Sequence, residues 1–436
     1  MNAKAANVTN SIRSLSRSFP DGQIPVVRTI WLASLGSALE FYDFVIFAFL
    51  APVIGKVFFA AGLADWVRQL QTFAIFAAGY FARPLGGITM GHFGDVRGRK
   101  RIFTLSIFLM AVPTLLIGFL PTYQSIGMAA PILLLALRIV QGIAIGGEAP
   151  GAWVFVAEHA GRGRTGFAVG MLTSGLSFGI LLASLVALYT TSAFSQAEIA
   201  GRVWRFPFLL GGVFGFTALW LRRWLAETPV FEDMRKRAAI AQQMPFGVVL
   251  RNHKRSIGIS VLSTWMLTAA IVVVILMSPA LLQSLFRVSP QSALQANLAG
   301  CAALCLSVVA VGVATDRFGM RRVSVVMSAL LIFGVYVLYF GAERIPSALV
   351  PLYIIAGIGA GCATLAPMVM VAAFPPAIRF TGVSISYNVA YAVFGGLTPL
   401  VVTSLSHLSP FGAPTYVAGA TMAGLIAILI GQRRND

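Results

Sequence analysis

The stretch GHFGDVRGRKR, residues 91–101, carries five charged side chains in eleven positions, in a chain where charged residues make up only 11% of the total. The stretch GVATDRFGMRR, residues 312–322, repeats its spacing. In both copies an Asp follows a Gly by four positions, and a second Gly follows the Asp by three. These residues are Gly91, Asp95, Gly98, Gly312, Asp316 and Gly319. The repeat predicts a chain built from two homologous halves.

The composition predicts that both halves lie in a membrane. Hydrophobic residues make up 58% of the 436 residues, well above the share in soluble proteins. A helix needs about 20 largely apolar residues to cross a bilayer. About twelve segments meet this requirement, and they begin near residues 29, 69, 101, 129, 164, 203, 256, 291, 321, 347, 379 and 412. The predicted fold is therefore all-α and integral to the membrane.

One long polar stretch, residues 221–255, separates the two halves and mixes both signs of charge. It is predicted to be a cytoplasmic linker. The resulting organisation is a cytoplasmic N-terminal segment, a six-helix half, the linker, a second six-helix half and a short cytoplasmic tail. Their expected boundaries are 1–28, 29–220, 221–255, 256–431 and 432–436.

The net charge of +18 raises the possibility of a nucleic-acid partner, but the distribution of the 32 Lys and Arg residues argues against it. With the N-terminus in the cytoplasm, most of these residues fall in cytoplasmic segments. The external loops carry only Arg68, Arg202, Arg205, Arg287 and Arg344. This asymmetry is the positive-inside rule. It predicts a multi-pass protein of the inner (plasma) membrane with both termini cytoplasmic, whose large-scale partner is the lipid bilayer and not nucleic acid.

Motifs for enzymatic or metal chemistry are missing from the sequence. The three cysteines lie in apolar spans without metal-ligand spacing. The four histidines are scattered at helix ends, and no phosphate-binding G-x-x-x-x-G-K-[ST] loop occurs. We therefore expect no enzyme, no cofactor and no metal. A channel or a non-transporting sensor is not excluded by these absences.

The paired loops resemble the signature of the major facilitator superfamily. Further stretches resemble its metabolite:proton symporter branch: SALEFYDF, ARPLGGITMGHFGD, RIVQGIAIGGE, LAETPVF and IRFTGVSISYNVAYAVFGGLTP. In one respect the chain departs from the family pattern, because Val96 stands between Asp95 and Arg97. The resemblance implies two six-helix halves with a substrate site between them, energy from a proton gradient and a monomeric protein.

The resemblance also implies that the paired loops latch the two halves together on the cytoplasmic side. Asp95 can accept hydrogen bonds from the N-terminus of a neighbouring helix, and the glycines permit close approach and a tight turn. A simple topology anchor is the alternative, but it explains only the basic residues. The expected gate residues are Gly91, Asp95, Gly98, Arg99, Arg101, Asp316, Arg317, Gly319 and Arg321.

Charged residues inside the spans are few, and each is costly in hydrocarbon. They are Glu40, Asp43, Arg83, Arg138 and Glu148. The first two share one helix face by their spacing, as do Arg138, Gln141 and Glu148 on a later helix. Asp43 and Arg138 are expected at similar depth, and Arg83 is a possible ion-pair partner of Glu148. The alternative to a functional role is a structural ion pair between helices.

These charges suit the coupling of proton and substrate movement. A carboxylate beside an arginine stays ionised, and it accepts a proton when the arginine turns to an anionic substrate. The candidate coupling residues are Asp43, Glu40 and Glu148. Candidate substrate-binding residues are Arg138, Gln141, Tyr387 and Asn388. The sequence thus predicts proton symport of a small organic acid, such as a di- or tricarboxylate, oxoacid or aromatic acid. A zwitterionic osmolyte transporter or a non-transporting sensor is the alternative.

Overall fold

The computed structural model describes residues 26–161, 163–222, 224, 227–236 and 245–432. Most of the expected N-terminal segment, residues 1–25, and most of the expected tail, residues 433–436, lie outside this range. All regular elements within the described residues are helical.

The first half contains six long helices. They are α2 (Val26–Phe49), α4 (Asp65–Arg97), α5 (Arg99–Phe119), α7 (Ala129–Ala160), α8 (Thr165–Ala193) and α10 (Arg205–Arg222). Short helices connect them at the end away from the repeated loops: α3 (Ala51–Phe58), α6 (Tyr123–Ile126), α9 (Gln196–Glu198) and the π-helical turn Ile199–Val203.

The second half also contains six spans, but three of them are interrupted. The continuous ones are α15 (Pro290–Phe318), α16 (Met320–Arg344) and α21 (Gly412–Gln432). A π-helical stretch, Ala269–Met277, joins α13 (Lys254–Thr268) to α14 (Ser278–Phe286), and a 3-10 turn, Gly361–Thr364, joins α17 (Leu349–Ala360) to α18 (Leu365–Ala373). Another π-helical turn, Tyr391–Gly395, joins α19 (Arg379–Ala390) to α20 (Gly396–Leu408). Single 3-10 turns precede α17 and α19, at Pro346–Ala348 and Pro376–Ile378.

Within the described residues, 11 helical segments are long and apolar enough to cross a membrane. The helix α4 is a twelfth long helix of 33 residues, and its charged side chains lower its hydropathy. It packs against α7 and α19, so it runs inside the same bundle as the eleven. The predicted number of spans and the all-α membrane fold are therefore confirmed.

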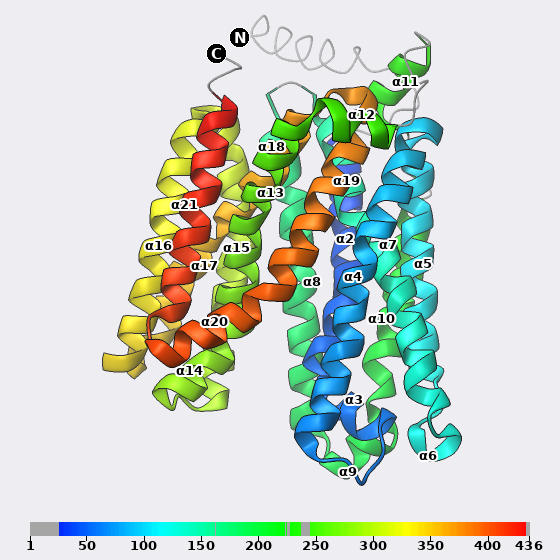
Figure 1. Ribbon diagram of the computed structural model, residues 1–436, viewed down its shortest axis with the longest axis vertical. Helices are drawn as coiled ribbons and strands as arrows, with labels where there is room; N and C mark the ends of the chain where they lie inside the picture. Colours follow the sequence, from blue (N-terminus) through cyan, green and yellow to red (C-terminus); the bar gives the residue numbers. More distant parts are fainter. Residues whose placement is uncertain (1–25, 162, 223, 225–226, 237–244, 433–436) are drawn as a thin grey trace, which may run out of the picture.

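The two halves use the same helix pairing (Figure 1). In the first half α2 packs on α8, α4 on α7 and α5 on α10; in the second, α13 packs on α19, α15 on α17 and α16 on α21. The main contacts between the halves are α4 with α19 and α8 with α15. The sequence repeat is thus a structural repeat.

The described part of the polar stretch between the halves is partly helical. The helix α10 continues to Arg222 and α13 already begins at Lys254. Between them lie α11 (Pro229–Lys236) and α12 (Pro245–Asn252). Figure 1 shows both short helices at the end of the bundle where the two chain termini are marked. We call this end the repeat end, because the two repeated loops also lie there.

Candidate functional site

The interior of the first half is built on backbone contact between α4 and α7. A side chain on Gly142 would collide with the carbonyl oxygen of Gly79, and one on Gly146 with that of Arg83. Only glycine allows two helices to approach this closely. The contact fixes the positions of Arg83 on α4 and Arg138 on α7 relative to each other.

Arg138 is fully buried and has no carboxylate partner among the described residues. Its Nη1 donates to Gln141 Oε1 at 2.8 Å, and Gln141 Nε2 donates to Thr114 Oγ1 at 2.7 Å. Its Nε and Nη2 have no hydrogen-bond partner. Three phenylalanine rings surround the guanidinium carbon, with centroids 4.8, 4.4 and 5.2 Å away: Phe44, Phe47 and Phe76. The group therefore keeps two donors free while aromatic faces stabilise its charge.

Arg83 is a second buried cation held in the same way. Its Nε donates to Asn388 Oδ1 at 3.4 Å, while its Nη2 has no partner. The rings of Tyr391, Tyr387 and Tyr80 lie 4.5, 5.3 and 5.5 Å from its guanidinium carbon. The Phe44 centroid is 6.0 Å from this carbon and 4.8 Å from that of Arg138. The two guanidinium groups therefore lie near the same Phe44 ring.

Asp43 and Glu148 are buried, and none of their four carboxylate oxygens has a hydrogen-bond partner in the described protein. The possible ion pair of Arg83 with Glu148 does not form, because the Arg83 Nε is directed to Asn388. The Asp43 carboxylate instead points at α10, where an added Cβ on Gly215 would be 3.3 Å from its Oδ2.

Asp43 is nevertheless connected to Arg138. A Cβ added at Gly211 would touch both the Asp43 Oδ1 and the Thr114 methyl group, which places these two side chains next to each other. The hydrogen-bonded chain from Arg138 through Gln141 to Thr114 therefore ends beside the carboxylate. The side chain of Glu40, the other candidate on α2, lies outside the described residues.

Asn388 and Tyr387 join the second half to these charges. The Asn388 Nδ2 donates to the carbonyl of Gly146 at 2.6 Å and to that of Ser384 at 2.8 Å, while its Oδ1 accepts from Arg83. The Tyr387 ring packs edge-on against Trp153, with centroids 5.0 Å apart. Asn388 therefore makes bonds between helices, and Tyr387 covers Arg83.

The sequence analysis assigned no role to the aromatic residues that surround the two arginines. These are Phe44, Phe47, Phe76, Tyr80 and Tyr391. Two local signals were available. Phe44 directly follows Asp43 in the sequence. Tyr80 precedes Arg83 by three positions, so Tyr80 and Arg83 share one face of α4. Phe47 follows Phe44 by three positions on α2, and Phe76 precedes Tyr80 by four on α4, so helical spacing also groups these residues. Tyr391 comes from the second half, and no local spacing links it to them.

At the repeat end, Asp95 caps the N-terminus of α19. Its carboxylate accepts from the backbone N–H of Thr381 at 2.9 Å and of Phe380 at 3.3 Å, and from the Thr381 hydroxyl at 2.9 Å. Gly91, one turn earlier, lies so close to Thr381 that an added Cβ would be 3.0 Å from the Cα of that residue. The first repeated loop thus holds the first half against the second.

Buried ion pairs surround this contact. Arg99 Nη2 lies 3.4 Å from Asp95 Oδ1 and donates to the carbonyl of Pro376 at 2.6 Å. Arg99 Nε lies 3.1 Å from Glu158 Oε2, and Arg379 Nη1 lies 2.9 Å from Glu158 Oε1. Glu158 therefore bridges an arginine from each half. The sequence analysis missed it because it stands at a helix end, where a charge needs no partner.

The connecting segment also reaches the first loop. Glu227 Oε1 accepts from the backbone N–H groups of Arg99 and Lys100, each at 3.2 Å, at the start of α5. Gly98 turns the chain between α4 and α5 with a φ of 109°, in the region that favours glycine. Arg101, another of the expected gate residues, is exposed.

The second loop repeats the capping contact with fewer partners. Asp316 is exposed, and its two oxygens accept from the backbone N–H of Gly166 and of Phe167 at the start of α8, each at 2.8 Å. Gly319 makes the turn with a φ of 84°. Arg317 lies over the Phe318 ring at 5.3 Å, and Arg321 is exposed.

Among the described residues, the hydrogen bonds between the halves lie from mid-depth to the repeat end. Besides the two loops, Ser174 Oγ donates to the Cys305 carbonyl at 2.8 Å, and Thr364 contacts Thr173 at 3.4 Å. At the opposite end, the ribbons of α14 and α20 stand apart from those of α3 and α9 (Figure 1). In this structure the halves are joined at the repeat end.

Comparisons with known proteins agree with this architecture. A citrate-proton symporter of Klebsiella pneumoniae is 30% identical over 406 residues, which covers 92% of this chain and 90% of the relative. A putative proline/betaine transporter of Staphylococcus aureus (strain COL) is 29% identical over 411 residues, 92% of this chain and 87% of the relative. The solved proton:xylose symporter XylE shares the fold with a TM-score of 0.76 and 17% identity, over 94% of this chain and 95% of that one.

The family model named Major Facilitator Superfamily matches residues 33–399, which include both repeated loops and all of the buried central charges. Its match covers more than half of the chain. Together with the two six-helix halves, it shows that this protein is a membrane transporter of the major facilitator superfamily.

Proposed function

We propose that this protein takes up a small organic acid together with protons across the inner membrane, by alternating access. One observation carries the proposal: among the described residues, Arg138 and Arg83 are buried at the centre without a carboxylate partner and keep hydrogen-bond donors free. Guanidinium groups bind carboxylates bidentately, and an unpaired charge in the membrane interior is costly. An acid with two carboxylates would satisfy both cations at once.

In this proposal, Asp43 is the carboxylate that binds the transported proton. The chain from Arg138 through Gln141 to Thr114 ends beside this carboxylate, so an anion bound at Arg138 changes the electrostatic field at Asp43. A negative ligand weakens the support that the cation gives to the ionised carboxylate and thereby favours its protonation. Substrate and proton would then bind together and be released together. Glu148 and Glu40 are the further candidates for this role.

Alternating access would use the two repeated loops. The positive-inside rule places the repeat end in the cytoplasm. The described arrangement, joined at that end, then corresponds to the state that faces outward. Opening inward requires Asp95 and Asp316 to release the helix N-termini that they cap. We expect the transporter to act as a monomer without a cofactor.

A second candidate substrate class is a zwitterionic osmolyte. The aromatic rings around the two arginines favour it, because such rings also bind quaternary ammonium groups. The relatives described as putative proline/betaine transporters point in the same direction. The second unpaired arginine argues for the acid, since it would repel the ammonium group.

Uptake into proteoliposomes distinguishes these candidates. We would compare labelled citrate, succinate, proline and glycine betaine, each with an inward proton gradient and with a protonophore. The proposal predicts accumulation of an acid that the protonophore abolishes. An Arg138→Ala variant reconstituted in parallel is the matched control, because it removes the cation and keeps the helix.

Gradient-driven accumulation of betaine or proline without any acid would select the osmolyte function. Downhill flux that the proton gradient does not change would contradict symport altogether.

A further inference from the structure

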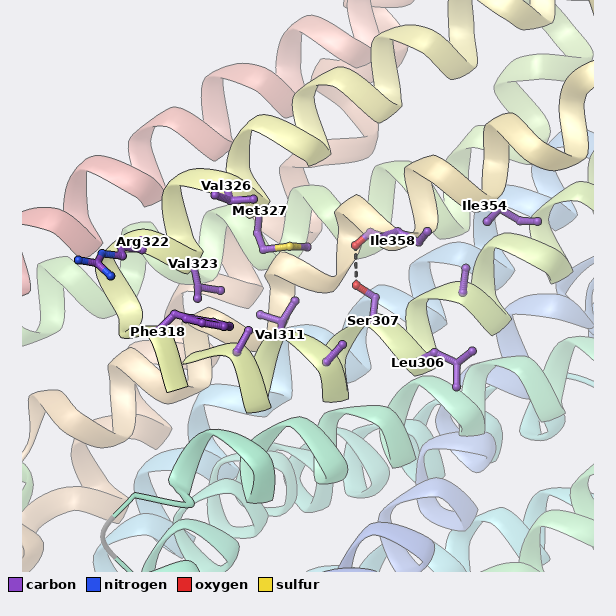
Figure 2. A pocket seen from close by; sticks show the side chains of 13 residues that line it. Leu306, Ser307, Val311, Phe318, Arg322, Val323, Val326, Met327, Ile354 and Ile358 are labelled. Atoms are coloured by element: carbon purple, nitrogen blue, oxygen red, sulfur yellow. Dashed lines mark hydrogen bonds between the residues drawn. The ribbon is translucent and has the colours of Figure 1, made fainter. Parts of the chain in front are cut away.

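A groove of about 700 Å³ runs along α15, α16 and α17 of the second half (Figure 2). Its lining residues all come from these three helices, whereas the central charges belong to α2, α4 and α7 of the first half. The groove is therefore separate from the proposed transport site, and nothing in the transport mechanism uses it.

The groove opens to the surroundings of the helices. Leu306 is 75% exposed, Val326 63% and Phe318 55%. On helices that cross a membrane, large apolar side chains of this exposure contact lipid. The molecule that meets this surface is therefore the acyl chain of a phospholipid.

The groove is long enough to cover the depth of one leaflet of the membrane. Its α15 side runs from Ala303 to Phe318, which is about 22 Å at a rise of 1.5 Å per residue. The hydrocarbon core of a bilayer is about 30 Å thick, so one leaflet supplies about half of that depth. An acyl chain that starts at the repeat end can thus lie along the groove over the depth of its own leaflet.

The chemistry of the groove changes along its length. Its one serine, Ser307, donates its hydroxyl proton to the Ile358 carbonyl at 2.7 Å, so this part of the lining offers no free donor. The one charged lining residue is Arg322, and Figure 2 shows it at one end together with Phe318 and Val323. Arg322 is exposed in the first turn of α16, where the chain enters the membrane at the repeat end. The lining contains no carboxylate.

We propose that this groove binds an anionic phospholipid of the surrounding membrane, with one acyl chain along α15 and α17 and the headgroup phosphate on Arg322. An arginine near the membrane surface adds about 1 kcal/mol of attraction for an anionic lipid, or about fivefold in affinity. The remaining affinity comes from the apolar lining and does not depend on the headgroup.

The test compares phosphatidylglycerol with phosphatidylcholine of identical acyl chains. Each lipid is titrated into the purified full-length protein in a non-ionic detergent, and native mass spectrometry counts the bound molecules. We expect one lipid to bind first, with phosphatidylglycerol about fivefold tighter than phosphatidylcholine. Arg322→Gln should remove this preference, and Arg322→Lys should retain it because the positive charge remains.

Two further variants separate this site from general surface attraction. Arg321→Gln removes a neighbouring positive charge outside the groove, and it should keep the preference for phosphatidylglycerol. Ala310→Trp should fill the groove and weaken the binding of both lipids equally. Because Ala310 is exposed, the indole ring has room outside the core. Ala314→Phe tests the same volume if the first variant does not fold. Equal binding of both lipids to the wild type, an Arg321→Gln effect as large as that of Arg322→Gln, or full binding to the filled groove would overturn the proposal.

Discussion

The two halves share one helix pairing but differ in the charges that they bury. Among its described residues, the first half buries seven charged side chains, four at the centre and three at the repeat end: Asp43, Arg83, Arg138, Glu148, Asp95, Arg99 and Glu158. The polar residues buried deep in the described spans of the second half are neutral, as in Asn297, which donates to the Ile275 carbonyl at 2.8 Å and to Tyr353 Oη at 3.3 Å. The two halves therefore share the scaffold, while the described buried charges lie in the first half. The second half contributes Asn388, Tyr387 and Tyr391, which contact Arg83.

The two repeated loops also differ in burial: the aspartate of the first loop is buried, and that of the second is exposed. Asp95 is buried, with three donors from the second half and an ion pair to Arg99. Asp316 is exposed and has two backbone donors. One sequence motif thus makes a strong contact in one half and a weaker one in the other, because the strength of a charged hydrogen bond depends on its burial.

Replacing a central charged residue of the first half should reduce substrate affinity more than any other substitution considered. Arg138→Ala removes the cation proposed to bind the anion, and truncating one partner of a buried charge pair costs about 2 to 5 kcal/mol. We expect substrate affinity to fall at least about 30-fold. Arg138→Lys should keep part of the affinity as a point charge without the bidentate fork. Binding of the acid to purified protein, followed by isothermal titration calorimetry, measures both.

The matched variant in the second half is Asn297→Ala. It removes bonds to a π-helical stretch and should lower the thermal stability while substrate affinity changes little. If Asn297→Ala and Arg138→Ala reduced affinity equally, the proposed division of roles between the halves would be wrong.

The next effect concerns coupling. Asp43→Asn keeps the size of the side chain but removes the group proposed to take up a proton. Accumulation driven by a pH gradient should therefore fail, whereas exchange of labelled for unlabelled substrate should continue. Proteoliposomes allow both assays, with Glu40→Gln and Glu148→Gln measured alongside. Normal accumulation by Asp43→Asn, together with failure of one of the other two variants, would move the coupling role to that residue.

The gate variants should differ from each other. Asp95→Asn weakens charged, buried hydrogen bonds worth about 1.5 to 3 kcal/mol each. Asp316→Asn loses an exposed interaction with a helix N-terminus, worth about 0.3 to 1 kcal/mol. Both should slow uptake without changing substrate affinity, and Asp95→Asn should slow it more. A larger effect of Asp316→Asn on the initial uptake rate would refute the comparison between the loops.

The smallest expected effect tests the link between the two central groups. Thr114→Val removes the hydroxyl that accepts from Gln141. It retains the shape of the side chain, whose methyl group lies next to Asp43. We expect the free-energy coupling between anion binding at Arg138 and protonation of Asp43 to fall by about 1 kcal/mol. This loss appears as a fewfold weaker pH dependence of substrate affinity. Titrations at several pH values measure this, and an unchanged pH dependence would show that Thr114 takes no part.

Much of the fold was accessible from the sequence, because membrane spans follow from hydropathy and the repeat was visible in two short loops. The contact of Asp95 with a helix N-terminus could be anticipated, since an acidic residue among glycines suits a capping role. Helix bounds were less accurate: α4 begins at Asp65 and not near residue 69, because the apolar run does not mark where the helix starts.

The partners of the central charges could not be predicted. Depth along a helix follows from counting residues, but the direction of a side chain depends on how neighbouring helices are rotated. Arg83 therefore meets Asn388 from the other half instead of Glu148. Asp43 turns toward α10, because Gly211 and Gly215 leave room there. These contacts join residues far apart in the chain, and no local pattern records them.

The central claim is that an anion at Arg138 promotes protonation of Asp43. The most direct measurement is the pH change of a weakly buffered solution of purified protein when the transported acid is added at saturation. The account predicts net proton uptake by the wild type and none by Asp43→Asn, although that variant still binds the acid. Equal proton uptake by both proteins, or binding to the wild type without proton uptake, would contradict it.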